Sequence, residues 1–470
     1  MSGLFSILGS TASALNAQSE AISVTGNNIS NVNNPDYSEE TVDFQPLAAV
    51  ETDDGLENTG LSVDVSQDRN SILDQMVRQE GSLTSGYTAQ QTVLQQAQAS
   101  LGENVTASST SGSSATTSES GLSAAIDSFF NAVESYAANP SDATQSQSLV
   151  QQAGVLTDRF QQVDQNLAQV QSGATAQVQS GVTTVNGLLQ QVASLNDQIN
   201  SLQSGASSGS ALQLVDQREG VLEQLAGYLP VTVTEGTSGE DQVSTTDSQG
   251  QSVTLVSNAT VASSISLSNG ALYAGDPPDA LGFSSGSLQG TLTASSGAVQ
   301  SLRTSLDQLA SQIVTSVNAA YNPGNTAGGN FFAASGTTAG TIALDPNLTA
   351  ATVTAGTGGS GDNSIALAVA AVANQDFSTA GGDAIDGTIT QAYAGSLAGI
   401  GQALSTANEE VTDQTNVQTV VTNERASVSG VSIDQEMSNL VTYQRAYQAS
   451  SEVFQVIDDM LNTLLTDLSA

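Results

Sequence analysis

The C-terminal segment of the chain repeats an apolar residue at every seventh position over five consecutive heptads. These residues are Ile433, Leu440, Tyr447, Phe454, Leu461 and Leu468. A second apolar set follows three positions later, at Tyr443, Ile457 and Leu464. No proline or glycine occurs after Gly430, so nothing in this segment terminates a helix. A sustained repeat of seven favours a long helix that packs along a partner helix, with a helix inside one globular domain as the alternative.

The N-terminus carries a weaker apolar stripe with the same period. Its members are Leu8, Leu15, Ile22 and Ile29. Polar Thr11, Gln18 and Thr25 occupy the second seam position, so the stripe is narrow. We therefore expect the first and last helices to pair with each other, and the first helix to need neighbouring subunits for its order. The stripe ends in an asparagine-rich stretch before Pro35, which predicts an exit into a turn.

Between these ends the apolar period changes along the chain. Helical periodicity is found at 70–103, 122–138, 149–202, 212–228, 364–374 and 384–426. After Pro230 the pattern alternates with a period of two, as in Val253 with Leu255 and Ile265 with Leu267, which predicts strands. Two further short strands are predicted at 341–344 and 351–354. One helix, from Val299 to Val317, interrupts this part.

The predicted fold class is α+β and multidomain. It combines terminal coiled-coil helices, a long helical bundle made from both halves of the chain, and an inserted outer β domain. The terminal domain comprises residues 1–35 with 430–470, and the bundle comprises 36–229 with 360–429. The β domain spans 230–359. This nesting brings the two termini together.

The composition narrows the chemistry that the chain can perform. It has 46 acidic residues and seven basic ones, all arginine, with a net charge of −39 and no lysine, histidine or cysteine. So acidic a surface repels phosphate backbones and anionic headgroups, which disfavours nucleic-acid and membrane-surface roles. The usual zinc ligands, thiol nucleophiles and Ser-His-Asp triads lack their residues. We expect no catalytic site, cofactor or metal.

Two motifs imitate functional sites. Residues 356–361 read Gly-Thr-Gly-Gly-Ser-Gly and match the spacing of a dinucleotide-binding loop, with Asp376 about twenty residues later. A glycine-rich turn follows where the second strand of that motif belongs, so a chance match in a chain with 43 glycines is favoured. Adjacent carboxylates such as Glu409 and Glu410 point about 100° apart on a helix and do not converge on a substrate.

The segments beside the terminal helices resemble the signatures of flagellar axial proteins, the family of rod, hook and hook-associated subunits. Residues 26–38 read Gly-Asn-Asn-Ile-Ser-Asn-Val-Asn-Asn-Pro-Asp-Tyr-Ser. Their signature positions are Asn27, Asn28, Asn31, Pro35 and Tyr37. Residues 443–450 read Tyr-Gln-Arg-Ala-Tyr-Gln-Ala-Ser. Their signature positions are Tyr443, Gln444, Tyr447 and Gln448.

Internal motifs are similar to the hook-associated branch of this family. They are 195–199 (Leu-Asn-Asp-Gln-Ile), 216–219 (Asp-Gln-Arg-Glu), 286–290 (Gly-Ser-Leu-Gln-Gly), 330–332 (Asn-Phe-Phe) and 361–364 (Gly-Asp-Asn-Ser). One departure is Asp36, which stands where the family commonly has glycine. Because aspartate tolerates left-handed turn geometry, we expect the turn to be kept.

The resemblance implies a structural subunit, without enzymatic activity, at the junction between hook and filament. It implies polymerisation into a ring through the terminal helices, with hook protein and the second junction protein as neighbours. It also implies export through the flagellar type III apparatus, without N-terminal cleavage, and a cytoplasmic chaperone on the C-terminal helix. Another axial subunit (hook, rod or flagellin-like) and a flagellum-displayed adhesin are the alternatives.

Overall fold

The computed structural model describes residues 2–469 apart from 47–49, 53–54, 58–59, 103–120, 204–208, 237–238, 276, 327–328 and 360. Its contacts divide the chain into two compact units. The first unit contains Met1–Leu83, Thr183–Phe283 and Gln414–Ala470. The second contains Thr84–Val182 and Ser284–Asp413. Three long helices, α2, α4 and α9, run through the boundary between the two units.

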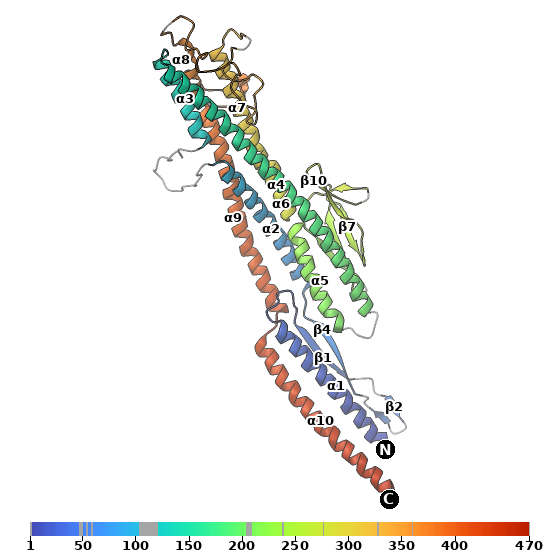
Figure 1. Cartoon of the computed structure of the whole chain (residues 1–470). Coiled ribbons are helices and arrows are strands. Elements are labelled where there is room, and N and C mark those ends of the chain that lie inside the picture. Colours follow the sequence, from blue (N-terminus) through green and yellow to red (C-terminus); the bar gives the residue numbers. More distant parts are fainter. Residues whose placement is uncertain are drawn as a thin grey trace. The chain divides into compact units, whose positions relative to one another are not determined.

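The first unit contains the paired terminal helices. Helices α1 (Ser2–Asn31) and α10 (Ile433–Ser469) lie side by side and run in opposite directions, so both chain ends lie at one end of the pair (Figure 1). Strands β1 (Glu40–Pro46) and β4 (Leu61–Gln67) form an antiparallel hairpin that packs on α1. Strands β2 (Val50–Thr52) and β3 (Gly55–Glu57) pair within the same hairpin.

The rest of the first unit combines helices with two small sheets. The helical parts come from α2 (Ser71–Ser100), α4 (Ala143–Gln203), α5 (Gly209–Tyr228) and α9 (Ile389–Ser429). One sheet has the order β5-β6-β7-β8, with strands Thr232–Glu235, Asp241–Thr246, Ser252–Ser257 and Thr260–Val261. The other has the order β11-β10-β9, with strands Asp279–Ala280, Ala271–Ala274 and Ile265–Ser268.

Two buried or half-buried asparagines attach the sheets to α4. The amide nitrogen of Asn196 donates to the carbonyl oxygens of Asp241 and Asn258, both at 2.7 Å. Asn186 donates to the carbonyl of Ile265 at 2.9 Å and accepts from its backbone N–H at 2.8 Å. These side chains satisfy backbone groups that would otherwise lose hydrogen bonds on burial.

The second unit is a helical bundle. Besides parts of α2, α4 and α9, it contains α3 (Leu122–Ala138), α6 (Ser287–Ala294), α7 (Gln300–Tyr321) and α8 (Ser364–Ala371). A π-helical segment, η1 (Ser295–Val299), joins α6 to α7, and two short 3-10 segments, η2 (Val372–Asn374) and η3 (Thr379–Gly381), follow α8. Its core is mostly aliphatic and contains an aromatic cluster: Phe129, Phe331 and Phe332 are almost fully buried and make edge-on or tilted ring contacts.

The long helices were predicted well, and the strands less so. The two strands predicted at 341–344 and 351–354 are wrong: neither segment forms a strand, and the first contributes only an isolated bridge between Phe332 and Leu344. The hairpin β1–β4 was missed inside a region predicted to be helical. Strands β5–β11 belong to the unit that holds both termini, and the three-domain division stays a prediction.

The close packing of α2 against α6 predicts how adding one methyl group at their contact changes stability. A β-carbon on Gly290 would overlap the backbone carbonyl of Gly86, so the two helices approach as closely as glycine allows. We expect Gly290→Ala to lower the free energy of unfolding by about 1–3 kcal/mol. Gly173→Ala on α4 is the matched control, because its β-carbon meets no atom within 4 Å and alanine favours a helix by up to about 1 kcal/mol. Urea unfolding compares the two, and equal effects would contradict the close contact.

Candidate functional site

The α1–α10 pair is the candidate site, and the side chains that it buries differ from the predicted stripe. The buried residues of α1 are Thr11, Ala17, Ala21, Val24, Thr25 and Asn28. Leu8, Leu15, Ile22 and Ile29 are only half-buried. The helix therefore buries small and polar side chains on its packed face, which lets the hairpin and α10 approach its backbone closely. A role for the half-buried stripe in polymerisation stays a prediction.

Only some of the heptad residues predicted to form the apolar seam of α10 are buried. Glu436 and Ile457 are buried, and Leu440, Tyr443, Phe454 and Leu461 are half-buried. Ile433 and Tyr447 keep 50% and 41% of their surface exposed. The side chain of Leu468 lies outside the described residues.

Asn28 connects α1, β1 and α10 through its side-chain amide, which is 1% exposed. Its nitrogen donates to the carbonyl of Glu40 at 2.8 Å and to a carboxylate oxygen of Glu436 at 3.1 Å. Its oxygen accepts from the hydroxyl of Tyr37 at 2.8 Å and from the N–H of Glu40 at 3.0 Å. Asparagine offers two donors and an oxygen with two lone pairs, so all four bonding positions of Asn28 are used. Two signature residues, Asn28 and Tyr37, thus lock the first helix to the last.

The other signature residues have more local contacts. Asn31 donates from its side chain to the carbonyl of Asn27 at 3.0 Å, at the end of α1. Tyr443 packs edge-on against Phe44 of β1, with 5.9 Å between the ring centroids. Gln444 and Gln448 are exposed on α10.

The turn after α1 is fixed without left-handed backbone at Asp36. Among the described residues other than glycine, positive φ angles occur at Asn258, Asn269 and Asn325, so Asp36 keeps an ordinary φ. Its carboxylate instead packs against α5, where a β-carbon on Gly220 would lie 2.7 Å from an Asp36 oxygen. The chain does turn at this point, but without the left-handed geometry that was the reason for expecting aspartate to be tolerated there.

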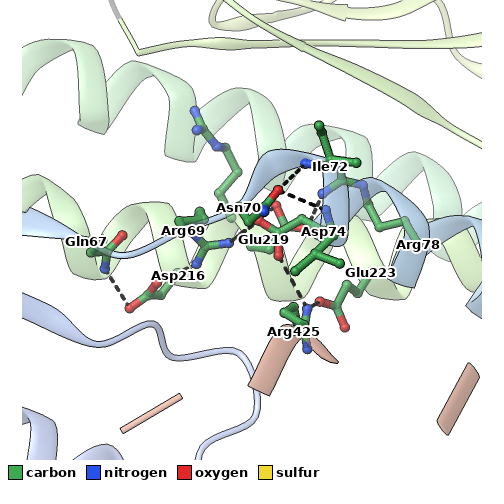
Figure 2. Close-up of polar contacts among 12 residues, drawn as sticks. Gln67, Arg69, Asn70, Ile72, Asp74, Arg78, Asp216, Glu219, Glu223 and Arg425 are labelled. Atoms are coloured by element: carbon green, nitrogen blue, oxygen red, sulfur yellow. Dashed lines mark hydrogen bonds and ion pairs between the residues drawn. The ribbon is translucent and has the colours of Figure 1, made fainter. Parts of the chain in front are cut away.

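A cluster of charged residues joins α2, α5 and α9 next to this turn (Figure 2). Arg69 lies between Asp216 on α5, at 2.6 Å, and Asp74 on α2, at 3.3 Å. Arg78 pairs with Glu219. In this cluster, basic side chains offset the cost of burying carboxylates between three helices.

Arg425 extends the charged cluster to the turn after α1. It pairs with Glu223 on α5 and lies 3.8 Å from Asp74, and it also donates to the carbonyl of Pro35 at 3.3 Å. Asp216 and Glu219 belong to a motif that the sequence analysis identified, whereas no motif identified Arg69 and Arg425. The small number of arginines in this acidic chain is the sequence feature that could have drawn attention to them.

Several acidic residues near Asn28 and the charged cluster have raised pKa values. Burial raises the pKa of Glu40 to about 7, and the negative charges of Asp216 and Glu20 add to the shift. Burial also raises the pKa of Asp216 to about 6, in spite of its ion pair with Arg69. Glu40 lacks an arginine partner in the described residues, so its ionised form is disfavoured.

The motifs that imitate functional sites have structural roles. In the glycine-rich loop at 356–361, the carboxylate of Asp362 accepts from the backbone N–H of Gly358 at 2.6 Å and of Ser364 at 3.0 Å. These backbone N–H groups are therefore already bonded to a carboxylate of the chain itself. The described residues contain no cluster of three or more acidic side chains suited to a metal ion. None of the described helices is long and apolar enough to cross a membrane.

Comparisons with known sequences agree with this arrangement. A family profile described as "Flagellar hook-associated protein FlgK helical domain" matches residues 111–332. Profiles of "Flagella basal body rod protein" and "Flagellar basal body rod FlgEFG protein C-terminal" match residues 8–37 and 423–467, which lie on α1 and its turn and on α9 and α10. The two rod-protein profiles thus coincide with the paired ends.

Relatives match over their whole lengths. Flagellar hook-associated protein 1 of Bacillus subtilis is 24% identical, with 100% of this chain and 99% of the relative covered. The Salmonella typhimurium protein of the same name is also 24% identical, with 98% and 99% covered. A solved structure, the flagellar hook junction protein FlgK from Burkholderia pseudomallei, superposes with a TM-score of 0.63 at 16% identity. It covers 76% of this chain and 100% of that one, which shows a shared fold.

Paired terminal helices carrying these signatures define a structural protein of the flagellar axis. Within that class, the full-length relatives and the helical-domain profile identify one family. The chain belongs to the family of flagellar hook-associated protein 1.

The hydrogen bonds of Asn28 predict a large effect of its removal. We expect Asn28→Ala to lower the free energy of unfolding by about 2–3 kcal/mol, because buried polar groups of Tyr37, Glu40 and Glu436 lose their partner. Hydrogen exchange should speed up in both α1 and α10. Asn33→Ala is the matched control, since Asn33 is an exposed asparagine of the same turn. Unchanged exchange in α10 would contradict the connection.

Glu40 predicts a pH dependence. Its pKa of about 7 in the folded chain exceeds the ordinary value of 4.5, so the native state binds more protons between those values. Stability from this group is therefore present below about pH 4.5 and is lost as the pH rises through 7, by up to about 3 kcal/mol. Glu40→Gln should be more stable than the parent at pH 8 and match it at pH 4. The exposed Glu452→Gln is the control, and identical profiles for all three would refute the argument.

Proposed function

We propose that this chain is a structural subunit of the bacterial flagellum that forms the junction between hook and filament and polymerises through α1 and α10. The observation that carries the proposal is that the two terminal helices are locked together while α10 leaves much of its apolar surface uncovered. Eight of the sixteen large apolar side chains that are exposed among the described residues belong to this heptad-bearing helix. This combination suits a helix pair that packs against other pairs.

The exposed apolar residues of α10 run along its length. They are Ile433, Met437, Val441, Tyr447, Val453, Val456, Met460 and Leu464, each at least 38% exposed. Single exposed apolar residues are ordinary, but a series on one helix marks an interaction surface. The groove between the two helices, lined by Ile7, Thr11, Leu61 and Val453 among others, adds to this surface.

The hydrogen bonds of Asn28 also support the proposal, because they explain how α1 becomes ordered within a single copy. Helix α1 has a weak apolar stripe, and an isolated helix of this kind is marginal in water. The hydrogen bonds of Asn28 and the contact between Phe44 and Tyr443 hold it against α10 and the hairpin. The pair then presents a preformed surface to the next subunit, which lowers the entropy cost of assembly.

The assembly that we infer is a ring of copies, with hook protein on one side and the second junction protein on the other. Family membership supports these neighbours, and the solved relative is described as a hook junction protein. We also propose export through the flagellar type III apparatus, with a cytoplasmic chaperone covering α10 beforehand. The exposed apolar series on α10 gives such a chaperone a surface to bind.

The alternatives are less favoured. Hook and rod subunits share the terminal signatures, which the two rod-protein profiles also match. The helical-domain profile at 111–332 and the full-length relatives both belong to hook-associated protein 1. No observation on β5–β11 favours an adhesin, so we retain a structural role.

Truncating the chain before Phe454 tests the role of α10. The shortened chain should remain soluble, with the bundle folded, and should abolish filament assembly and motility, because its last helical turns are missing. Val456→Asp should weaken assembly through one exposed apolar position, and Gln455→Asp, at the adjacent exposed polar position, is the matched control. Swimming assays and electron microscopy of flagella report the outcome. Normal filaments on the truncated chain would refute the proposal.

A further inference from the structure

A second group of exposed apolar side chains lies on α2 and α9 in the first unit. Of the sixteen large apolar side chains that are exposed among the described residues, eight belong to α10 and five to these two helices. Single exposed apolar residues are ordinary, whereas a group on neighbouring elements marks an interaction surface. The five, named here the α2–α9 face, are Ile72, Met76, Val417, Val420 and Val428, which are 68%, 40%, 45%, 67% and 47% exposed.

Contacts within the first unit place α2 and α9 side by side in opposite directions. A guanidinium nitrogen of Arg425 on α9 lies 3.8 Å from a carboxylate oxygen of Asp74 on α2. Seven residues further along α2, a β-carbon on Gly81 would lie 3.5 Å from the side-chain nitrogen of Gln418, which is seven residues back along α9. The two helices therefore keep one register, in which the α2–α9 face extends over a single stretch about 16 Å long.

Both helices turn their basic residues away from this face. Arg78 is the one basic residue in the sequence of α2, and Arg425 is the one in α9. Both pair with carboxylates of α5 (Figure 2). At about 100° per residue, Met76 is turned by about 160° from Arg78, and Val420 by about 140° from Arg425. The exposed apolar residues thus face away from α5.

The charged residues beside the α2–α9 face are acidic. Glu424 is exposed on α9 between Val420 and Val428, and Glu80 follows Met76 by about one turn of α2. Because the basic residue of each helix is turned towards α5, these carboxylates set the charge of the surface. A complementary partner therefore carries apolar side chains flanked by basic ones.

The charge balance disfavours a second copy of this chain as the occupant. Helix α10, which exposes the other apolar residues, has six acidic residues and one arginine in its sequence. A second α2–α9 face would bring Glu80 and Glu424 against the same two acids. Five of the seven arginines of each copy are already held in internal ion pairs. Like charges brought together in an interface cost free energy, so a different protein fits better.

We propose that the α2–α9 face docks an amphipathic helix of a different protein, whose apolar side is flanked by lysine or arginine. Two helices packed side by side can hold a third against both of them. A stretch of about 16 Å corresponds to about three turns of a docked helix. The apolar residues supply affinity by leaving water, and Glu80 and Glu424 select the basic flanks. The surface lies outside α1 and α10, so the inference goes beyond assembly through the terminal helices.

Peptide binding to the purified full-length chain tests the chemistry of the surface. Two fluorescein-labelled synthetic helices share one leucine stripe and carry either lysine or glutamate along its flanks. The lysine peptide should bind at least about tenfold more tightly at low ionic strength. Val420→Asp should weaken its binding by about tenfold, and Val155→Asp, at an exposed valine of the second unit, should not. No binding of the lysine peptide, equal binding of both peptides or equal effects of both variants overturns the proposal.

Photo-cross-linking identifies the natural partner. The full chain with p-benzoylphenylalanine at position 420 is produced in its own cells and irradiated, and the cross-linked peptide is sequenced by mass spectrometry. The expected product joins the chain to a different protein through a segment that carries lysine or arginine. Glu424→Arg should lower its yield by about fivefold, whereas Glu409→Arg, at an exposed acid of α9 in the second unit, should not.

The outcomes of this cross-linking separate the inference from the proposed function. A product with a second copy of the chain, a product through an acidic segment, or no product overturns the docking of a basic helix. Urea midpoints of the purified variants establish that each one folds. If no such partner is found while truncation before Phe454 still abolishes filaments, the α2–α9 inference is refuted and the proposed function stands.

Discussion

The side-chain amide of Asn28 holds the beginning and the end of this chain together. Its four hydrogen bonds reach Tyr37, both backbone groups of Glu40, and Glu436 on the last helix. Residues 28 and 436 are far apart in the sequence, so the intervening bundle must fold back on itself for this connection to form. A weak first helix gains order from the connection.

The cluster of charged residues beside the turn after α1 shows how an unusually acidic chain uses its few basic residues. Arg69, Arg78 and Arg425 each pair with carboxylates from other helices (Figure 2). Glu40 has no such partner among the residues that the structure describes, and its burial raises its pKa to about 7. The first unit therefore combines acids paired with arginine, of which Asp216 still has a pKa raised to about 6, with the unpaired Glu40.

The sequence predicted long-range organisation better than local packing. Five heptads without a helix breaker made α10 predictable, and Asn139-Pro140 marked the end of α3. The phase of α1 was not predictable, because its packed face consists of alanines, threonines and Asn28 with a single valine, Val24, and hydrophobicity marks such a face only weakly. Strands β1 and β4 were missed although each has seven residues and Val42 and Phe44 alternate as strands do. The signature around Asn28 pointed to the site, whereas the ion pairs of Arg69 and Arg425 depend on tertiary contacts that no local pattern encodes.

Cryo-electron microscopy of the assembled hook–filament junction tests the central claim most directly. The account predicts that each subunit keeps α1 antiparallel to α10, with Asn28 bonded to Glu436, and that neighbouring pairs contact one another through the exposed apolar residues of α10. A junction in which α10 separates from α1, or in which the terminal helices make no contact with neighbouring copies, would contradict it.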